Sequence, residues 1–298
     1  MINLTFKQLR YFEALARHRH FGRAAEACAI SQPALSMQIK ELEETLAAQL
    51  FERGARDVRL TAFGEDIALK VREILRGVDE LGDFARTAQS QPLGRLRLGV
   101  IPTIAPYLLP RLVARLEGLY PGLDLQVRET LTRTLVDELS EGRIDAAIVA
   151  LPISEPALAE VALFDEAFVL VRPAAEATAP EPRVEALRDM RLLLLEEGHC
   201  FRDQALAFCN MSPSQPREGL DGSSLSTLVQ LVSSGIGVTL LPEMAIEVET
   251  RSAPLDVARF QDPVPMRTVG MIWRRTSPLV AELAEVASEV ARLGKRGK

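Results

Sequence analysis

The sequence predicts an α/β protein that consists of a small helical N-terminal domain, a long connecting helix and a larger domain in two lobes. Three observations carry this prediction. Apolar residues recur at helical spacing through residues 1–60, one apolar stripe continues in steps of three and four from Phe63 to Ala88, and beyond Arg95 short strand-like runs alternate with helical ones. We therefore expect domain boundaries at 1–60, 61–92 and 93–298.

Composition and charge narrow the class of protein. The 298 residues carry a net charge of −6, which argues against a surface that binds nucleic acid throughout, but residues 1–60 hold nine Lys and Arg against seven Asp and Glu. Three cysteines do not make a secreted disulfide scaffold, and the sequence shows neither a signal segment nor an apolar run of membrane-spanning length. We expect a cytoplasmic protein without membrane contact, whose basic surface lies at the N-terminus.

The N-terminal domain has the pattern of a helix-turn-helix. A first helix over about 4–18 precedes a short second helix over Phe21–Cys28, and Ser31 is a suitable N-cap for a third helix with Pro33 in its first turn. A left-handed helix end at Ala47 would cost about 1 kcal/mol, so we expect the third helix to continue through that residue. Its apolar stripe consists of Leu35, Ile39, Leu42 and Leu46.

Polar and basic residues surround the expected turn. The third helix presents small polar residues opposite its apolar stripe, and three arginines alternate through residues 51–60, as in a β-hairpin wing that follows DNA phosphates. A solvated polar face is the plainer interpretation, but the coincidence of turn, cap, stripe and basic flank favours DNA binding. The residues that we expect to contact double-stranded DNA are Ser31, Gln32, Pro33, Ser36, Lys40, Arg53 and Arg56.

A single long helix is expected over residues 61–88. Its apolar stripe has no evident core of its own, so we expect it to pack against a second copy of the chain. A dimer of this kind places two recognition helices about one DNA turn apart, which implies a pseudo-palindromic target. Residues 89–94 (QSQPLG) would form the hinge.

The remaining residues alternate between strands and helices, which is typical of an α/β domain with largely parallel sheets. We expect lobe I over about 93–164 and 268–298, and lobe II over about 165–267. The helix N-termini at Pro102-Thr103 and Ser223-Ser224 would offer a small-ligand site in the cleft between them, although such turns are also ordinary caps. The expected strands are 96–101, 125–129, 146–151, 167–172, 192–195, 238–241 and 269–274, and the expected last helix is 278–293.

Two cysteines, Cys200 and Cys209, bracket a segment that contains no helix breaker. If the segment is helical, their Cα atoms lie roughly 13 Å apart, whereas a disulfide requires about 7 Å or less. The pair would then bridge only after its backbone is remodelled, as a redox switch requires; two buried structural thiols are the plainer alternative. A zinc site of His199, Cys200 and Cys209 would lack a fourth ligand, so we expect no metal and no cofactor. The third cysteine, Cys28, is expected to be core.

Beside these patterns, the chain resembles LysR-type transcriptional regulators over its whole length, and within them the hydrogen-peroxide sensors. The N-terminal segments that carry the family resemblance are Phe21–Glu26 (FGRAAE), Ser31–Ser36 (SQPALS), Ile39–Glu43 (IKELE) and Leu50–Arg53 (LFER). Those that indicate a peroxide sensor are Ile101–Pro110 (IPTIAPYLLP), Leu163–Glu166 (LFDE) and Gly198–Cys209 (GHCFRDQALAFC). The resemblance implies a winged helix-turn-helix, a linker helix and a regulatory domain like the periplasmic binding proteins.

The resemblance also implies roles for individual residues. Cys200 would be oxidised by hydrogen peroxide to a sulfenic acid and Cys209 would close the disulfide, while nearby cationic side chains, Arg202 among them, would stabilise the thiolate. The implied partners are a second chain or a dimer of dimers (a homotetramer), promoter DNA, hydrogen peroxide as the signal, and RNA polymerase for an activator. The residues implied to form the peroxide pocket are Thr103, Thr132, His199 and Arg274.

Two further interpretations remain open. A regulator of the same family that senses a metabolite in the cleft would share the fold, and the cysteine pair would then be incidental. A thiol peroxidase would need rapid turnover with a reductant and would not carry a helix-turn-helix. We therefore expect a regulator and not an enzyme.

Overall fold

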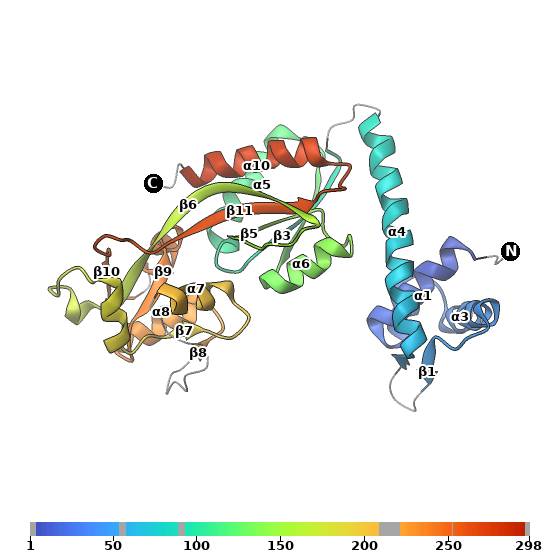
Figure 1. Cartoon of the computed structure of the whole chain (residues 1–298), viewed down its shortest axis with the longest axis horizontal. Helices are drawn as coiled ribbons and strands as arrows, with labels where there is room; N and C mark the ends of the chain where they lie inside the picture. Colours follow the sequence, from blue (N-terminus) through green and yellow to red (C-terminus); the bar gives the residue numbers. More distant parts are fainter. Residues whose placement is uncertain (1–3, 54–57, 89–92, 209–220, 252, 296–298) are drawn as a thin grey trace. The chain divides into compact units, whose positions relative to one another are not determined.

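A computed structural model describes residues 4–53, 58–88, 93–208, 221–251 and 253–295 of the chain (Figure 1). The chain forms two compact units, Met1–Gln89 and Ser90–Lys298. None of the helices in the described ranges is both long and apolar enough to cross a membrane.

The first unit is a three-helix head with a hairpin and a long helix. Its elements are α1 (Phe6–His18), α2 (Phe21–Ala27), α3 (Gln32–Leu46), the antiparallel strands β1 (Phe51–Arg53) and β2 (Val58–Leu60), and α4 (Ala62–Ala88). Phe12, Leu15, Leu35, Ile39 and Leu42 fill the core, and the rings of Phe12 and Phe51 lie 5.3 Å apart. The predicted helix-turn-helix and hairpin are confirmed.

Polar caps explain where these helices begin and end. The hydroxyl of Ser31 accepts a hydrogen bond from the Ala34 amide at 3.4 Å, as predicted, and the imidazole of His20 caps α2 by accepting from the amides of Gly22 and Arg23. The expected continuation of α3 through Ala47 is wrong: Ala47 adopts φ 51°, and its amide donates to the last carbonyls of α3. Those hydrogen bonds offset the cost of the left-handed conformation.

The apolar stripe of α4 is divided between two environments. Val71 is buried in the core of the head. Gly64 allows α4 to approach the Leu50 backbone closely, because a Cβ on Gly64 would lie 2.2 Å from the Leu50 carbonyl oxygen. The expectation that the whole stripe lacks a core is therefore corrected. Ile74 and Leu81, further along α4, are exposed.

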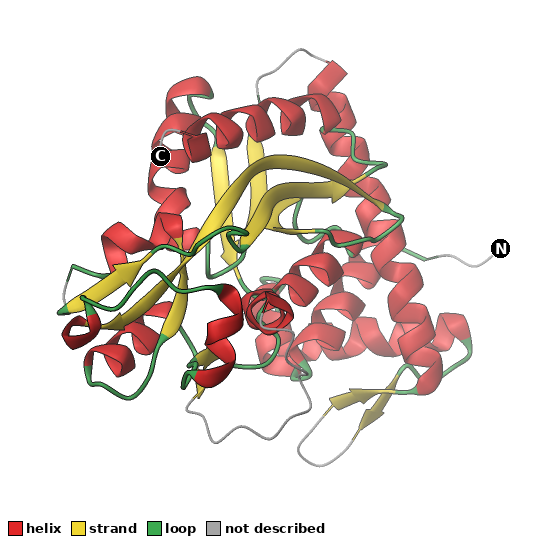
Figure 2. Cartoon of the chain, turned by 60° about the vertical axis from the view of Figure 1, so that its left-hand side comes forward, coloured by secondary structure: helices red, strands yellow, loops and turns green. Residues whose placement is uncertain are grey.

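The second unit contains a curved seven-stranded sheet (Figure 2). Its order is β10 (Leu255–Ala258), β6 (Leu158–Pro173), β11 (Met266–Arg274), β5 (Ala146–Leu151), β3 (Arg95–Val100) and β4 (Asp124–Glu129), with β9 (Thr239–Pro242) also paired to β6. Only β3 is parallel to its neighbours, β4 and β5; every other pair is antiparallel, so the prediction of largely parallel strands is wrong. The reason is that β6 pairs antiparallel with β11 over residues 158–167 and then continues to pair antiparallel with β9 and β10.

Two buried apolar clusters fill the second unit. One draws on residues between Leu93 and Leu163 and between Val269 and Val290, and the other on Tyr107 and residues between Phe168 and Phe260. The predicted lobe boundaries stay predictions. The helices of the unit are α5 (Ala105–Leu119), α6 (Thr132–Ser140), α7 (Cys200–Phe208), α8 (Leu225–Ser233), α9 (Ile246–Glu249) and α10 (Val280–Lys295), with 3₁₀ turns η1 (Ala174–Glu176), η2 (Val184–Asp189) and η3 (Glu243–Ala245); β7 (Leu194–Leu195) and β8 (Asp221–Gly222) form a short parallel pair.

Candidate functional site

Cys200 is the first residue of α7 and lies where the two apolar clusters of the second unit meet. Phe201, Ala205 and Leu206 of the same helix are buried in the cluster of residues 168–260, whereas Cys200 packs, half-buried, against the other cluster. Its thiol therefore occupies the positive end of the helix dipole, where a negative charge is stabilised. The structure confirms the predicted helix after Cys200; Cys209 lies outside the described residues, and its distance from Cys200 stays a prediction.

The loop before α7 contacts the start of α6. Gly198 has φ +96°, a conformation that glycine adopts without strain, and a Cβ at this position would lie 3.1 Å from Leu131. Leu131 is the N-cap of α6 and provides no side-chain hydrogen bond to the free amides of the first turn. The next residue is Thr132, so the loop that leads into Cys200 is packed against the end of α6 on which this predicted pocket residue lies.

One buried polar atom at the start of α6 and one in the middle of α7 have no hydrogen-bond partner within the described part of the chain. They are the hydroxyl oxygen of Thr132 and the side-chain carbonyl oxygen of Gln204. Gln204 is four residues after Cys200 on α7 and so lies on the same helix face. Leaving such an atom unsatisfied costs about 1–3 kcal/mol, so the two atoms are suited to hold a small polar molecule. Gln204 is a residue that the sequence analysis missed, although its spacing from Cys200 was visible.

Thr103 lies at the same sheet edge as Thr132. Val100 and Glu129 are paired at the carboxyl ends of the parallel strands β3 and β4, and the two threonines follow three residues after each. Carboxyl ends of adjacent parallel strands are a common location for binding sites. Thr103 is buried, and its hydroxyl accepts a hydrogen bond from Nη1 of Arg267 at 2.8 Å, which leaves its own proton free for another acceptor.

Arg267 is held by a buried network. Its guanidinium also donates from Nη2 to the Thr103 carbonyl at 3.0 Å and from Nε to Oε2 of Glu166 at 2.8 Å. The other carboxylate oxygen of Glu166 accepts from the Met244 amide at 2.8 Å, and the guanidinium lies 5.8 Å from the centre of the Phe168 ring. A charge pair this deeply buried is retained only with such complete hydrogen bonding.

Arg267, not Arg274, is therefore the arginine that the structure places on Thr103. Both belong to β11, but seven residues of extended strand separate them by roughly 23 Å. Nη1 of Arg274 donates to the carbonyls of Leu139 and Ile144 at 2.7 and 3.0 Å, near the end of α6 and the start of β5. The strand predicted from the sequence begins at Val269, so it leaves out Arg267, an arginine just before an apolar run.

The other charged residues expected to stabilise the thiolate have different surroundings. Arg202 donates to the Leu195 carbonyl and to the carboxylate of Asp221, at 3.0 and 2.7 Å, and so joins α7 to β7 and β8. Burial lowers the pKa of His199 below its usual 6.5, although the charge of Glu196 acts in the opposite direction. His199 is therefore mainly neutral at pH 7 and acts as a hydrogen-bonding group.

The predicted DNA-contacting residues of α3 lie on its outer face. Ser31, Gln32, Pro33 and Lys40 are exposed and Ser36 is half-buried, while Lys40 forms an exposed ion pair with Glu44 at 3.5 Å. Arg53 is the last residue of β1; its side chain and the whole of Arg56 lie outside the described residues, as does most of the predicted hinge.

Ser224, suggested for the cleft, is an ordinary N-cap of α8 that accepts from the Thr227 amide at 3.2 Å.

Comparison with protein families matches both parts of the chain. The model of the bacterial regulatory helix-turn-helix protein of the lysR family matches residues 6–65, and that of the LysR substrate binding domain matches residues 89–292.

Curated relatives match almost end to end. A probable hydrogen peroxide-inducible genes activator from Streptomyces viridosporus is 45% identical over 288 residues, which are 95% of this chain and 92% of the relative. The DNA-binding transcriptional dual regulator OxyR of Escherichia coli K12 is 37% identical over 289 residues, which are 96% and 95% of the two chains.

Solved structures give the same result. A full-length OxyR variant from Pseudomonas aeruginosa is similar with a TM-score of 0.78 at 39% identity, covering 98% of this chain and 95% of that one. An OxyR mutant from Corynebacterium glutamicum with hydrogen peroxide bound has a TM-score of 0.68 at 35% identity, covering 99% and 94%.

Proposed function

Because the chain belongs to the LysR family and is similar to OxyR proteins over almost its whole length, it is a peroxide-sensing transcriptional activator, and we propose that Cys200 is the residue that peroxide oxidises. The observation that carries this assignment is the position of Cys200 at the N-terminus of α7, on one helix face with the unsatisfied Gln204 and two residues after Gly198, which packs on Leu131 next to the unsatisfied Thr132. This arrangement places the Cys200 thiol at the positive end of a helix dipole, on a helix that also carries a buried polar group without a partner among the described residues.

In the proposed first step, the Cys200 thiolate attacks one oxygen of hydrogen peroxide. The S–O bond forms as the O–O bond breaks, sulfur is oxidised to a sulfenic acid, and the second oxygen leaves as hydroxide and takes a proton to become water. Thr132 and Gln204 would hold the peroxide by its hydrogen bonds. Thr103 is suited to donate to the leaving oxygen, because Arg267 already occupies an acceptor position of its hydroxyl.

In the proposed second step, the thiolate of Cys209 attacks the sulfenic sulfur and releases water as the disulfide forms. The nine-residue helix α7 begins at Cys200 and ends at Phe208, so helical geometry separates the Cα atoms of these two residues by about 12 Å. One further residue spans at most about 3.8 Å, whereas a disulfide requires Cα atoms within about 7 Å. The disulfide therefore requires α7 to unwind. Unwinding would break the Arg202–Asp221 ion pair or strain it, which would transmit the oxidation to β8.

The change in the second unit would reach DNA through the assembly. We propose that the exposed apolar residues of α4, Ile74 and Leu81 among them, pair two chains, and that two such dimers form a tetramer. Its helix-turn-helix heads would bind pseudo-palindromic half-sites through α3 and the β1–β2 wing, and oxidation would change their spacing and so the recruitment of RNA polymerase. In the cytoplasm, each chain would be oxidised once and then reduced by a separate thiol system. The protein would therefore act as a sensor and not as an enzyme that turns over.

The experiment that tests the proposal compares wild type with Cys209→Ser. After treatment with one equivalent of hydrogen peroxide, wild type is expected to form an intramolecular disulfide and change its DNA footprint. Cys209→Ser is expected to stop at a sulfenic acid on Cys200 that a sulfenate-specific reagent traps. A trapped sulfenate on another residue, or none at all, would contradict the assignment.

A further inference from the structure

Met37 is a large apolar side chain on the outer face of α3. It is 56% exposed, whereas the other large apolar side chains of this helix, Leu35, Ile39, Leu42 and Leu46, are buried or half-buried. Single exposed apolar residues are common on protein surfaces, so exposure alone assigns no role to Met37. Its position on the helix and the charges around it are more informative.

Met37 lies in the half of α3 that a helix-turn-helix inserts into the major groove. It belongs to the second turn of the helix and follows Pro33 by four residues, so the two exposed side chains share a face. Helical side chains lean towards the N-terminus of their helix, which is the end that contacts base edges. The two residues therefore form a short apolar stripe beside Gln32 and Ser36, which are expected to contact DNA.

The charges on α3 favour a polyanion at its N-terminal half. Residues 32–40 carry no carboxylate, and the acidic side chains begin at Glu41. Lys40 forms an ion pair with Glu44 at 3.5 Å, and Gln38 donates to Glu41 at 2.7 Å, so these side chains are engaged along the helix. DNA phosphates are therefore repelled from the C-terminal half of α3 and not from the half that contains Met37.

A basic turn flanks the same half of α3. A Cβ on Gly22 would lie 3.8 Å from Oε1 of Gln32, so the start of α2 lies next to the start of α3. Arg19 and Arg23, which precede and follow Gly22, are both exposed. Exposed arginines are suited to hold DNA phosphates and so to fix the register of a helix in the groove.

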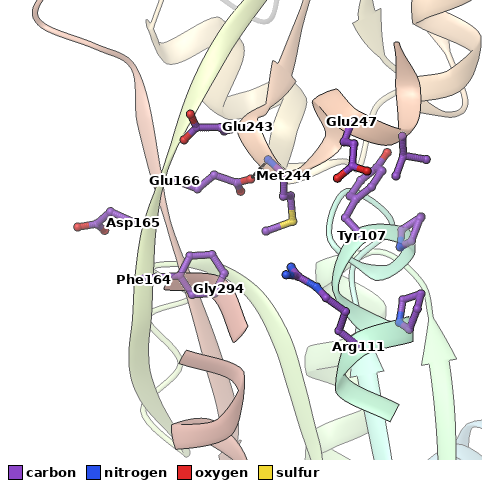
Figure 3. A pocket seen from close by; sticks show the side chains of 12 residues that line it. Tyr107, Arg111, Phe164, Asp165, Glu166, Glu243, Met244, Glu247 and Gly294 are labelled. Atoms are coloured by element: carbon purple, nitrogen blue, oxygen red, sulfur yellow. Dashed lines mark hydrogen bonds between the residues drawn. The ribbon is translucent and has the colours of Figure 1, made fainter. Parts of the chain in front are cut away.

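A groove in the second unit has the opposite charge beside its apolar wall (Figure 3). Among the residues that line it, the carboxylates of Asp165, Glu166, Glu243 and Glu247 outnumber the guanidinium of Arg111. That groove is a poor surface for DNA, because its carboxylates repel phosphates. Exposed apolar surface thus meets conditions suitable for DNA on α3 and not in this groove.

We propose that Met37 contacts the 5-methyl group of one thymine in each half-site and makes the protein prefer thymine at that position. Methionine is unbranched and adaptable, so it can pack on a base edge without a fixed geometry. The thymine methyl is the apolar group that the major groove displays, and no other base carries it. This inference rests on the proposed function, since it assumes that α3 enters the groove.

Replacement of thymine by uracil tests the contact, because deoxyuridine differs from thymidine only in lacking the 5-methyl group. Full-length reduced wild-type protein first selects a duplex from a random library, and each thymine of one half-site is then replaced in turn by deoxyuridine. Dissociation constants are measured by fluorescence anisotropy. At one position the replacement is expected to weaken wild-type binding about fourfold, as expected for the loss of one buried methyl group.

Met37→Ala is the variant that assigns this difference to one side chain. It is expected to bind the thymine and deoxyuridine duplexes equally at that position. Thr45→Ala, at an exposed residue in the C-terminal half of the same helix, is the matched control and should keep the fourfold difference. An undiminished difference in Met37→Ala, or the absence of any thymine whose replacement separates the two proteins, would overturn the contact.

Two further results separate this inference from the proposed function. If wild type selects no duplex, DNA binding by α3 falls and the thymine contact falls with it. If Met37→Ala keeps the thymine preference but changes the oligomeric state in sedimentation, Met37 contacts a second chain, and the thymine contact alone is overturned.

Discussion

Cys28 and Cys200 are both half-buried free thiols at the end of a helix, but the two ends are opposite. Cys28 is the C-cap of α2, where its amide donates to the carbonyls of Ala24 and Ala25 and the helix dipole is negative. Burial, followed by the charge of Glu13, raises the pKa of the Cys28 thiol and so keeps it protonated. Cys200 begins α7, at the positive end of the dipole.

The surroundings of the two thiols differ as much as the helix ends. Cys28 packs against the core of the head, whose other members are apolar. Cys200 lies at the junction of two cores and follows a loop that packs on the start of α6, where the Thr132 hydroxyl has no partner among the described residues. Two cysteines of similar exposure therefore have different chemistry, because the helix end and the polar neighbours differ between them.

The largest effect is expected from removing one thiol at a time. Cys200→Ser should abolish the peroxide-dependent change in DNA footprint, because serine at this position does not react with peroxide as a thiolate does. Cys28→Ser, the matched control, should keep the response at the wild-type peroxide dose. A Cys200→Ser protein that still responds would contradict the distinction between the two thiols.

A second test removes the charge that orients Arg267. Glu166→Gln leaves the fully buried guanidinium of Arg267 without its counter-charge. It should lower the free energy of unfolding of the second unit by about 3 kcal/mol, measured by urea denaturation. The control is Glu247→Gln, which removes an exposed ion pair with Arg251 and should cost less than about 1 kcal/mol. Equal losses in the two variants would show that the buried network contributes no more than a surface pair.

A third test concerns the unsatisfied hydroxyl of Thr132. Thr132→Val keeps the shape of the side chain but removes the hydroxyl, so the rate of Cys200 oxidation in stopped-flow measurements should fall about tenfold. Thr250→Val removes a hydroxyl that donates to the Ile246 carbonyl within α9 and should leave the rate unchanged. An unchanged rate in Thr132→Val would exclude this hydroxyl from the reaction.

The smallest effect is a pH dependence from His199. Because burial lowers its pKa in the folded state, the unfolded chain binds a proton first as the pH falls. The contribution of His199 to stability is therefore present above about pH 6.5 and is lost progressively below it, down to the lowered pKa of the folded state. When the denaturation midpoint is plotted against pH, His199→Gln should lack the part of the slope that His199 contributes. A slope identical to that of wild type would contradict the assignment.

The sequence predicted the head of the molecule best because its signals are local. The cap at Ser31, the stripe of α3 and the alternating hairpin residues each depend on neighbours within a few positions, and the structure confirms them. Ala47 is an exception, since the hydrogen bonds that stabilise its left-handed conformation form only once the helix ends there.

The candidate site was predicted only in part because it is assembled from distant segments. Cys200, Thr103 and Thr132 followed from the family resemblance, but the selection of Arg267 over Arg274 depends on where β11 begins and on its pairing with β6 and β5. Gln204 and Glu166 gain their importance from burial, which the sequence does not reveal. The antiparallel β6–β11 pair was likewise hidden, since a pairing between residues a hundred positions apart leaves no local pattern.

The most direct test measures both thiols in one molecule. Reduced wild-type protein is exposed to near-stoichiometric hydrogen peroxide for increasing times, the remaining thiols are alkylated, and the modification of Cys28, Cys200 and Cys209 is followed by mass spectrometry. Loss of free Cys200 and Cys209 together, as one disulfide, while Cys28 stays alkylatable is the predicted result. Oxidation of Cys28 at the same rate, or a Cys200 that stays free, would contradict the account.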